Sequence, residues 1–213
     1  VVLWLSASGK AGVMENGRLR AELQPVVNGG ATVVAVDLFM QGEFLREGES
    51  DAPTRWVKNP REAAAFTFGY NHALLAQRVH DVLSVLAWLR SSDARPERIA
   101  LVSLDSTAPV AAAAAALAGP AIDALVLDTK RFHFSEIRDL HDVNFLPGGA
   151  KYGDMPGLLA LGAPRRLFLM GEDAKAPPMV SAAYEAAGVP DRLRVTADRD
   201  LPAAVQRAVE SVK

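Results

Sequence analysis

Short apolar runs alternate with helical segments along the whole chain, and this alternation most restricts what the chain can fold into. The runs are rich in Val, Leu, Ile and Ala, as expected for strands covered on both faces. Repeated strand–helix order predicts an α/β three-layer sandwich whose mostly parallel sheet has right-handed crossovers. In their expected spatial order the strands are 32–37, 1–5, 98–103, 122–127, 166–170 and 192–197; the expected helices are 18–27, 73–91, 107–118, 155–162, 178–187 and 201–212.

Composition narrows the classes of protein and partner. The chain has 213 residues and no Gly/Ser-rich linker, so we expect a single domain over residues 1–213. Its net charge of −2 offers no footprint for nucleic acid, and no run approaches the ~18 apolar residues of a membrane span. Without cysteine there is no disulfide, thiolate metal site or cysteine nucleophile. Neither a metal-binding nor a phosphate-loop spacing occurs, so no metal and no cofactor is expected.

Residues 98–118 form the most informative local segment. They read as a strand, a tight turn of small residues and an Ala-rich helix. This is the layout of a nucleophile elbow, in which G-x-S-x-G lifts a serine above the sheet. The corresponding stretch here is Ser103-Leu104-Asp105-Ser106-Thr107, so the serine is displaced by one position and both glycines are absent.

Three further segments extend the likeness to a family. Residues 32–43 resemble the strand and loop V-D-x-x-G-x-G-E of α/β-hydrolases, and residues 68–83 resemble the helix before the elbow in acetyl-xylan-esterase-like members. Residues 142–148 resemble the segment before the acid-bearing strand. The resemblance spans nearly the whole chain and implies an α/β-hydrolase fold that lacks the first two strands. Because the chain opens on Val1, in an apolar strand without Met, we expect it to be part of a longer protein.

The family resemblance implies a serine, an acid and a histidine, with an oxyanion hole of backbone N–H groups. Aligning the strand places the nucleophile at Asp105, and aligning the helix places it at Ser106. An aspartate nucleophile occurs in the haloalkane dehalogenase branch of the fold. The alternative is that one of these residues caps helix 107–118 by accepting a free backbone N–H, and the sequence favours this structural role.

The acid and the oxyanion donors also have candidates. The acid should follow strand 166–170, where the family position falls on Ala174 and Asp173 stands one residue earlier. Asp173 is therefore the candidate acid, and a turn-forming role is its alternative. The candidate oxyanion donors are the backbone N–H groups of Ala7, after the first strand, and Thr107, after the nucleophile position.

The histidine is missing from its expected place, the loop 197–202, and none follows His141. A triad needs an imidazole to move the proton, and its loss costs on the order of 10⁴-fold or more in rate. His72 and His80, at helix 73–91, are expected to be structural.

Residues 130–154 form a long excursion that contains His133 and His141. Loops of this length are usually functional or disordered, and the aromatic content argues against disorder. We expect the excursion to fold over the carboxyl edge of the sheet, near the elbow, as a cover or a partner surface. His141 is then the candidate base.

Two functions from different classes remain. The first is a non-catalytic hydrolase-fold module of esterase lineage, with an upstream domain or a partner subunit as its partner. The second is an active esterase that hydrolyses acylated carbohydrate or another small carboxyl ester through a non-standard site. The missing histidine, shifted serine and displaced acid favour the first.

Overall fold

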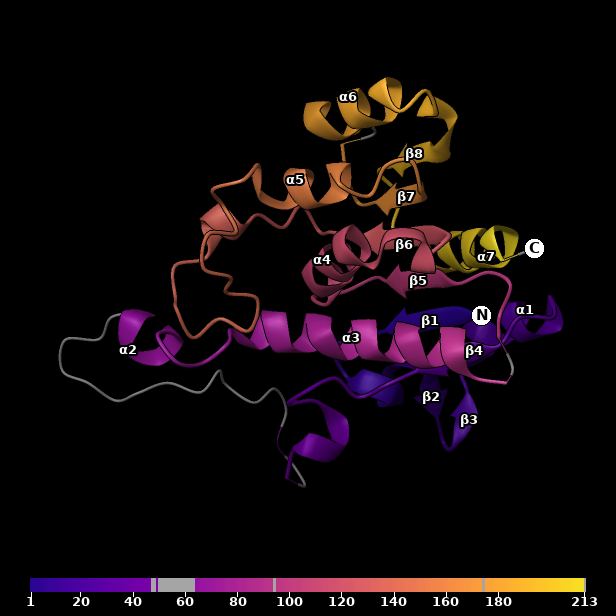
Figure 1. The fold of residues 1–213 in the computed structure, drawn as a ribbon. Coiled ribbons are helices and arrows are strands. Elements are labelled where there is room, and N and C mark those ends of the chain that lie inside the picture. Colours follow the sequence, from indigo (N-terminus) through magenta and orange to yellow (C-terminus); the bar gives the residue numbers. More distant parts are fainter. Residues whose placement is uncertain (47–48, 50–63, 94, 174, 213) are drawn as a thin grey trace.

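The computed structural model describes residues 1–46, 49, 64–93, 95–173 and 175–212 of the chain. Within them a six-stranded parallel sheet forms the centre, in the order β4-β1-β5-β6-β7-β8 (Figure 1). This confirms the predicted fold class and strand order, with the elbow strand in the interior of the sheet. The strands are β1 (Val2–Leu5), β4 (Val33–Ala35), β5 (Ala100–Ser103), β6 (Ala124–Asp128), β7 (Arg166–Met170) and β8 (Leu193–Thr196).

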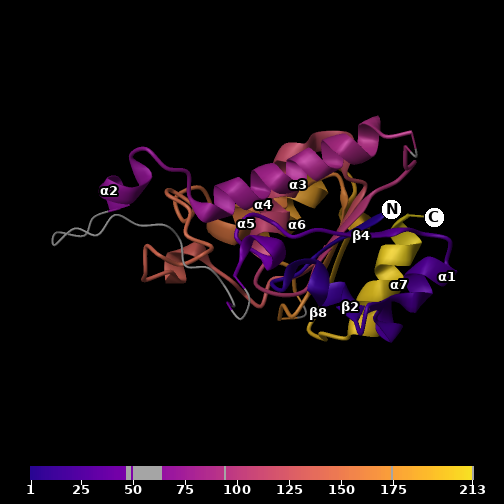
Figure 2. The same ribbon diagram turned by 90° about the horizontal axis from the view of Figure 1, so that it is seen from below.

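Helices cover both faces of this sheet and give three layers (Figure 2). One face carries α3, α4, α5 and α6, and the other carries α1 and α7. The helices are α1 (Gln24–Asn28), α2 (Ala64–Phe68), α3 (Leu74–Ser91), α4 (Ala108–Ala118), α5 (Asp154–Ala160), α6 (Pro178–Ala186) and α7 (Leu201–Ser211). Among the described residues, no helix has both the length and the apolar character needed to cross a bilayer.

The expected helix over residues 18–27 is wrong in its first half. Residues Met14–Glu15 and Arg18–Leu19 form a small antiparallel hairpin, β2 and β3, and α1 begins only at Gln24. The turn of the hairpin is Asn16-Gly17, and both residues have positive φ, 50° and 74°. Asn-Gly is the preferred pair for such a turn, because glycine takes positive φ without steric cost and asparagine tolerates it.

The elbow helix α4 lies close to the sheet because its side chains are small. Ala111, Ala112 and Ala114 are buried between the sheet and the neighbouring helices α3 and α5. Helix α3 buries one apolar face, as its periodicity predicts, and Val82 is fully buried there. This packing fixes the position of the β5–α4 turn, which carries the predicted nucleophile.

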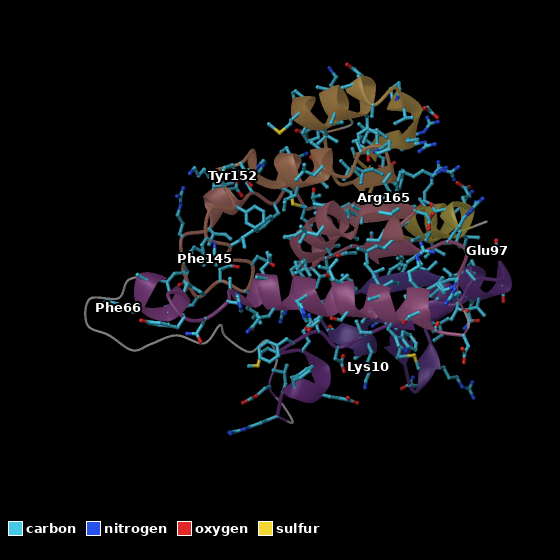
Figure 3. All side chains as sticks on the ribbon, in the orientation of Figure 1. Lys10, Phe66, Glu97, Phe145, Tyr152 and Arg165 are labelled. Atoms are coloured by element: carbon cyan, nitrogen blue, oxygen red, sulfur yellow. The ribbon has the colours of Figure 1, made fainter. Side chains whose placement is uncertain are left out.

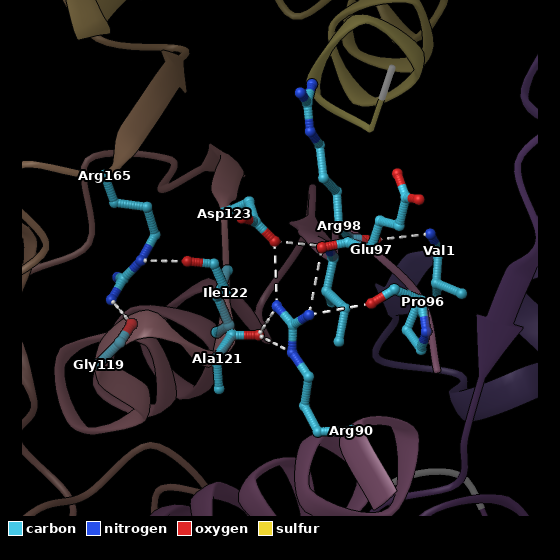
Figure 4. Close-up of polar contacts among 11 residues, drawn as sticks. Val1, Arg90, Pro96, Glu97, Arg98, Gly119, Ala121, Ile122, Asp123 and Arg165 are labelled. Atoms are coloured by element: carbon cyan, nitrogen blue, oxygen red, sulfur yellow. Dashed lines mark hydrogen bonds and ion pairs between the residues drawn. The ribbon is translucent and has the colours of Figure 1, made fainter. Parts of the chain in front are cut away.

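Two arginine side chains hydrogen-bond the segments at the amino edge of the sheet, beside β5 and β6 (Figure 4). Arg90, at the end of α3, lies 3.1 Å from Asp123 and donates to the carbonyl of Ala121 at 2.9 Å. Asp123 in turn accepts the N–H of Ile99 at 2.8 Å. Arg165 donates to two further backbone carbonyls. At this part of the edge, a carboxylate and backbone oxygens compensate Arg90, whereas Arg165 has two carbonyl acceptors and its buried Nη1 has no hydrogen-bond partner among the described residues.

Candidate functional site

The carboxylate of Asp105 joins two loops at the carboxyl edge of the sheet. Its Oδ2 accepts the N–H of Ala7 at 2.7 Å, from the loop after β1. Its Oδ1 accepts the N–H of Thr107 at 2.9 Å and the hydroxyl of the same residue at 2.8 Å. These two N–H groups are the ones that the sequence nominates as oxyanion donors. In this structure, therefore, both hydrogen-bond to a side chain of the protein itself.

The turn between β5 and α4 is relaxed. The bond from the Thr107 N–H to Asp105 forms an Asx turn that leads into α4, and the carbonyl of Asp105 accepts the N–H of Ala108 at 3.1 Å. The hydroxyls of Ser103 and Thr107 are 2.7 Å apart beneath it. No residue between 103 and 107 has positive φ. A nucleophile elbow, by contrast, holds its serine on a sharp, strained turn.

Ser106 is exposed at this turn. Its carbonyl accepts a hydrogen bond from Nδ2 of Asn144 at 3.2 Å, which places the excursion beside the turn as expected. Within the described chain, no hydrogen bond links Ser106 Oγ to another residue. The serine therefore has no base among these residues to take its proton.

Aromatic contacts order much of the excursion. Phe145 lies beside α2, where its ring is 5.1 Å from that of Phe68 (Figure 3). Phe134 is buried and packs edge-on against Phe132 at 5.0 Å. Tyr152 differs, because 76% of it is exposed. The excursion thus packs on the fold while presenting an aromatic ring to solvent.

The two histidines of the excursion each face a carboxylate. Nδ1 of His141 lies 2.8 Å from Oδ1 of Asp139, and the backbone N–H of His141 donates to the same oxygen. This backbone hydrogen bond lowers the pKa of Asp139 below its usual value. Nδ1 of His133 lies 3.7 Å from Asp154. No direct hydrogen bond joins either imidazole to Asp105 or Ser106, all of them described residues. His72 and His80 are both exposed at α3, apart from this turn.

The candidate acid Asp173 is exposed in the loop after β7 and forms an ion pair with Arg131 of the excursion. No hydrogen bond links it to an imidazole among the described residues. Ala174, the family position for the acid, lies outside the described residues.

A buried acid at the end of β6 was missed by the sequence analysis. Asp128, with a side chain only 6% exposed, lies 3.3 Å from Nε of Arg199, in the loop where the resemblance implies a histidine. Its other oxygen accepts the N–H of Lys130 at 2.9 Å. Gly171 leaves room for this pair, since a Cβ there would lie 2.6 Å from Asp128 Oδ1 and 2.5 Å from Arg199 Nε. In the sequence, Asp128 could have been found as a carboxylate that directly follows an apolar run at the carboxyl end of a predicted strand.

Arginine changes what this pair can do. A guanidinium remains protonated at all ordinary pH values and has only donors, so it cannot take a proton from a nucleophile. The loop after β8 therefore supplies Asp128 with a fixed positive charge. Among the described residues, no group of three or more His, Cys, Asp or Glu side chains is placed to hold a metal ion.

Comparison with known proteins gives likeness in structure only. No protein-family model matches the sequence, and no curated protein does. A candidate acetyl xylan esterase from Bacteroides fragilis matches with a TM-score of 0.61 and 18% identity over 93% of this chain. A CE15 glucuronoyl esterase from Teredinibacter turnerae matches with a TM-score of 0.58 and 16% identity over 99% of it. Another, from Caldicellulosiruptor kristjansonii, matches with a TM-score of 0.51 and 14% identity over 91%.

This chain spans less than two thirds of the length of each of these three proteins, namely 58%, 65% and 61%. These matches show that it has the α/β-hydrolase fold, as the resemblance implied. The three matched proteins are themselves described as esterases.

Proposed function

We propose that this chain is a non-catalytic α/β-hydrolase-fold domain of esterase lineage, in which Asp105 fills the oxyanion-binding position. The observation that carries the proposal is the pair of bonds from the N–H groups of Ala7 and Thr107 to this carboxylate. An oxyanion hole acts because its donors are free to meet charge that develops in the transition state. Here the carboxyl group of Asp105 already accepts both donors, so neither is free to meet such a charge.

The proton-transfer side supports the same proposal. Acyl transfer by a serine needs a base within about 2.6–3.2 Å of its hydroxyl, and no described residue hydrogen-bonds Ser106 Oγ. In the loop expected to carry the histidine, Arg199 neutralises Asp128. The partner of Asp128 in this loop is thus a guanidinium, which cannot take a proton from a nucleophile.

A domain of this kind would serve as a packing or binding unit. Its partner would be an upstream domain or a partner subunit, reached through the excursion that covers the carboxyl edge. Support comes from the exposed ring of Tyr152 on the excursion, since exposed aromatic side chains are enriched where proteins associate.

One observation favours a second candidate function, an esterase with a non-standard site. The imidazole of His141 is oriented by Asp139 at 2.8 Å, which is the arrangement that a catalytic histidine needs. Asn144, three residues further on, already contacts the backbone of Ser106. In this alternative Ser106 is the nucleophile, His141 the base and Asp139 the orienting acid in place of Asp173. The substrate would be acylated carbohydrate or another small carboxyl ester.

Ester hydrolysis separates the two candidates. We expect the purified chain to hydrolyse p-nitrophenyl acetate no faster than its Ser106→Ala, Asp105→Asn and His141→Ala variants. Ser91→Ala, on the exposed end of α3, is the matched control. A wild-type rate at least about 100-fold above that of Ser106→Ala, a typical contribution of general base catalysis, would establish the esterase and overturn the non-catalytic proposal. Loss of that rate in His141→Ala would identify the base.

A further inference from the structure

A groove lies at the amino end of β7 and β8, on the side of the sheet that carries α7. Its volume is about 360 Å³, within the range of small-molecule sites. Most of its charged lining is arginine, and the whole chain is slightly acidic, so the groove is opposite in sign to the molecule. The charged residues that line it are Arg166, Arg192, Arg194, Arg207, Asp191 and Glu210.

Strand register explains why the arginines gather there. Side chains two residues apart on a strand share a face, so Arg166 and Phe168 of β7 point to the same side. Arg194 of β8 is the register partner of Phe168 and lies on that side too. Phe168 packs against the apolar cluster under α7, and the guanidinium of Arg207 from that helix lies 5.4 Å from its ring centre. Arg166 and Arg194 thus share a face of the sheet with Phe168, whose ring lies against Arg207.

The charges in the groove are incompletely balanced. Arg207 pairs with Glu210 at 2.8 Å, and Arg192 donates to the carbonyl of Pro164 at 3.0 Å. Arg166 and Arg194 are exposed and form no ion pair with any described residue. Like charges on neighbouring strands repel each other, so an anion placed between them would relieve that repulsion.

We infer that this groove binds the phosphate group of a small phosphorylated molecule. Arg166 and Arg194 would hold the phosphate oxygens, because a guanidinium fork matches phosphate in a bidentate manner and carries a permanent positive charge. The ring of Phe168 and the stem of Arg207 would contact the organic part of the ligand. The groove lies at the opposite edge of the sheet from Asp105, so this inference is independent of the proposed function.

Calorimetric titration of the whole chain at low salt tests the inference, with inorganic phosphate and phenyl phosphate as probes. We expect both to bind, and phenyl phosphate to bind more tightly because it also meets Phe168. The double variant Arg166→Ala/Arg194→Ala should weaken binding at least about tenfold, as for loss of one charge-assisted contact. Arg194→Lys should also weaken it, because lysine keeps the charge without the fork.

The matched control is Arg18→Ala, in the hairpin on another part of the surface, which should leave affinity unchanged. Circular dichroism of each variant checks that it is folded, as expected for substitutions at exposed positions. Absence of binding by both probes would overturn the inference, as would binding that persists in the folded double variant. Equal affinity for the two probes would refute the contact with Phe168 and reduce the site to one for free phosphate.

Discussion

The two edges of the sheet treat charge differently. At the carboxyl edge, where parallel α/β folds place their chemistry, Asp105 and Asp128 are satisfied by donors of the same chain. At the amino edge, the groove beside β7 and β8 leaves Arg166 and Arg194 without a described partner of opposite charge. At the carboxyl edge, where a hydrolase would act, these carboxylates are therefore paired with donors of the protein itself. The arginines without a described carboxylate partner lie at the amino edge. The fold does not by itself locate a function.

The largest loss of stability should come from removing the Asp105 carboxylate at the carboxyl edge. Asp105→Ala leaves the N–H groups of Ala7 and Thr107 without their acceptor, and we expect it to lower the free energy of unfolding by about 2–4 kcal/mol. Urea denaturation measures the change. Ser106→Ala, at the exposed neighbouring position, should stay within about 0.5 kcal/mol. Equal stability of the two variants would contradict the account of this edge.

A smaller effect should distinguish the two ion pairs of the carboxyl edge. Arg199→Ala leaves the buried carboxylate of Asp128 without its cation. Because Arg199 itself is half exposed, we expect a loss at the upper end of the range for surface pairs, about 1 kcal/mol. Arg131→Ala removes an exposed pair with Asp173 and should cost under about 0.5 kcal/mol. Thermal unfolding of both variants measures the difference. A larger loss from Arg131→Ala would mean that the ion pair of Asp173, and not that of Asp128, contributes more to stability.

The pH dependence of stability tests how the excursion is attached. Burial alone would raise the pKa of Asp154, but the N–H groups of Met155, Phe134 and Ser135 outweigh it and lower that pKa below its usual value. A depressed pKa contributes stability above the unfolded value of about 4 and loses it as the pH falls through the folded value. Asp154→Asn should therefore flatten the stability curve below about pH 4. An unchanged slope in the variant would refute this anchoring.

The smallest change in stability is expected in the groove at the amino edge, beside β7 and β8. Arg166→Ala should change stability by no more than a few tenths of a kcal/mol, because this exposed side chain pairs with no described carboxylate. Arg90→Ala is the comparison variant, at the part of the same edge beside β5 and β6, where the guanidinium bonds Asp123 and several carbonyls. Chemical denaturation should show a clear loss for Arg90→Ala alone. Similar losses in both would show that Arg166 is a structural residue.

The sheet could be predicted from the sequence because each strand is a local apolar run and the strand–helix alternation dictates parallel pairing. The same patterns located α3 and α4. The prediction for segment 18–27 is wrong because its apolar residues suggest a helix, whereas the Asn16-Gly17 turn, a stronger local signal, starts a hairpin.

The candidate site could be predicted only in part. The sequence points to Asp105, Ala7 and Thr107 separately. The bond from Thr107 to Asp105 is local, but the bond from Ala7 to Asp105 spans 98 residues and follows from packing. Asp128 and Arg199 are similarly distant along the chain, and no local pattern links them. The sequence did indicate that no histidine follows His141. The structure adds that Arg199, in the loop where the resemblance implies a histidine, pairs with Asp128.

Amide hydrogen exchange at Ala7 and Thr107, followed by NMR, tests the central claim most directly. If the Asp105 carboxylate holds both N–H groups, both should be protected in the wild type. Asp105→Ala should then accelerate both together by about tenfold or more, since a hydrogen bond worth about 1.4 kcal/mol changes the opening equilibrium by that factor. Ser106→Ala should leave both rates unchanged. Rapid exchange of either amide in the wild type would show that the oxyanion donors are free, and would contradict the account.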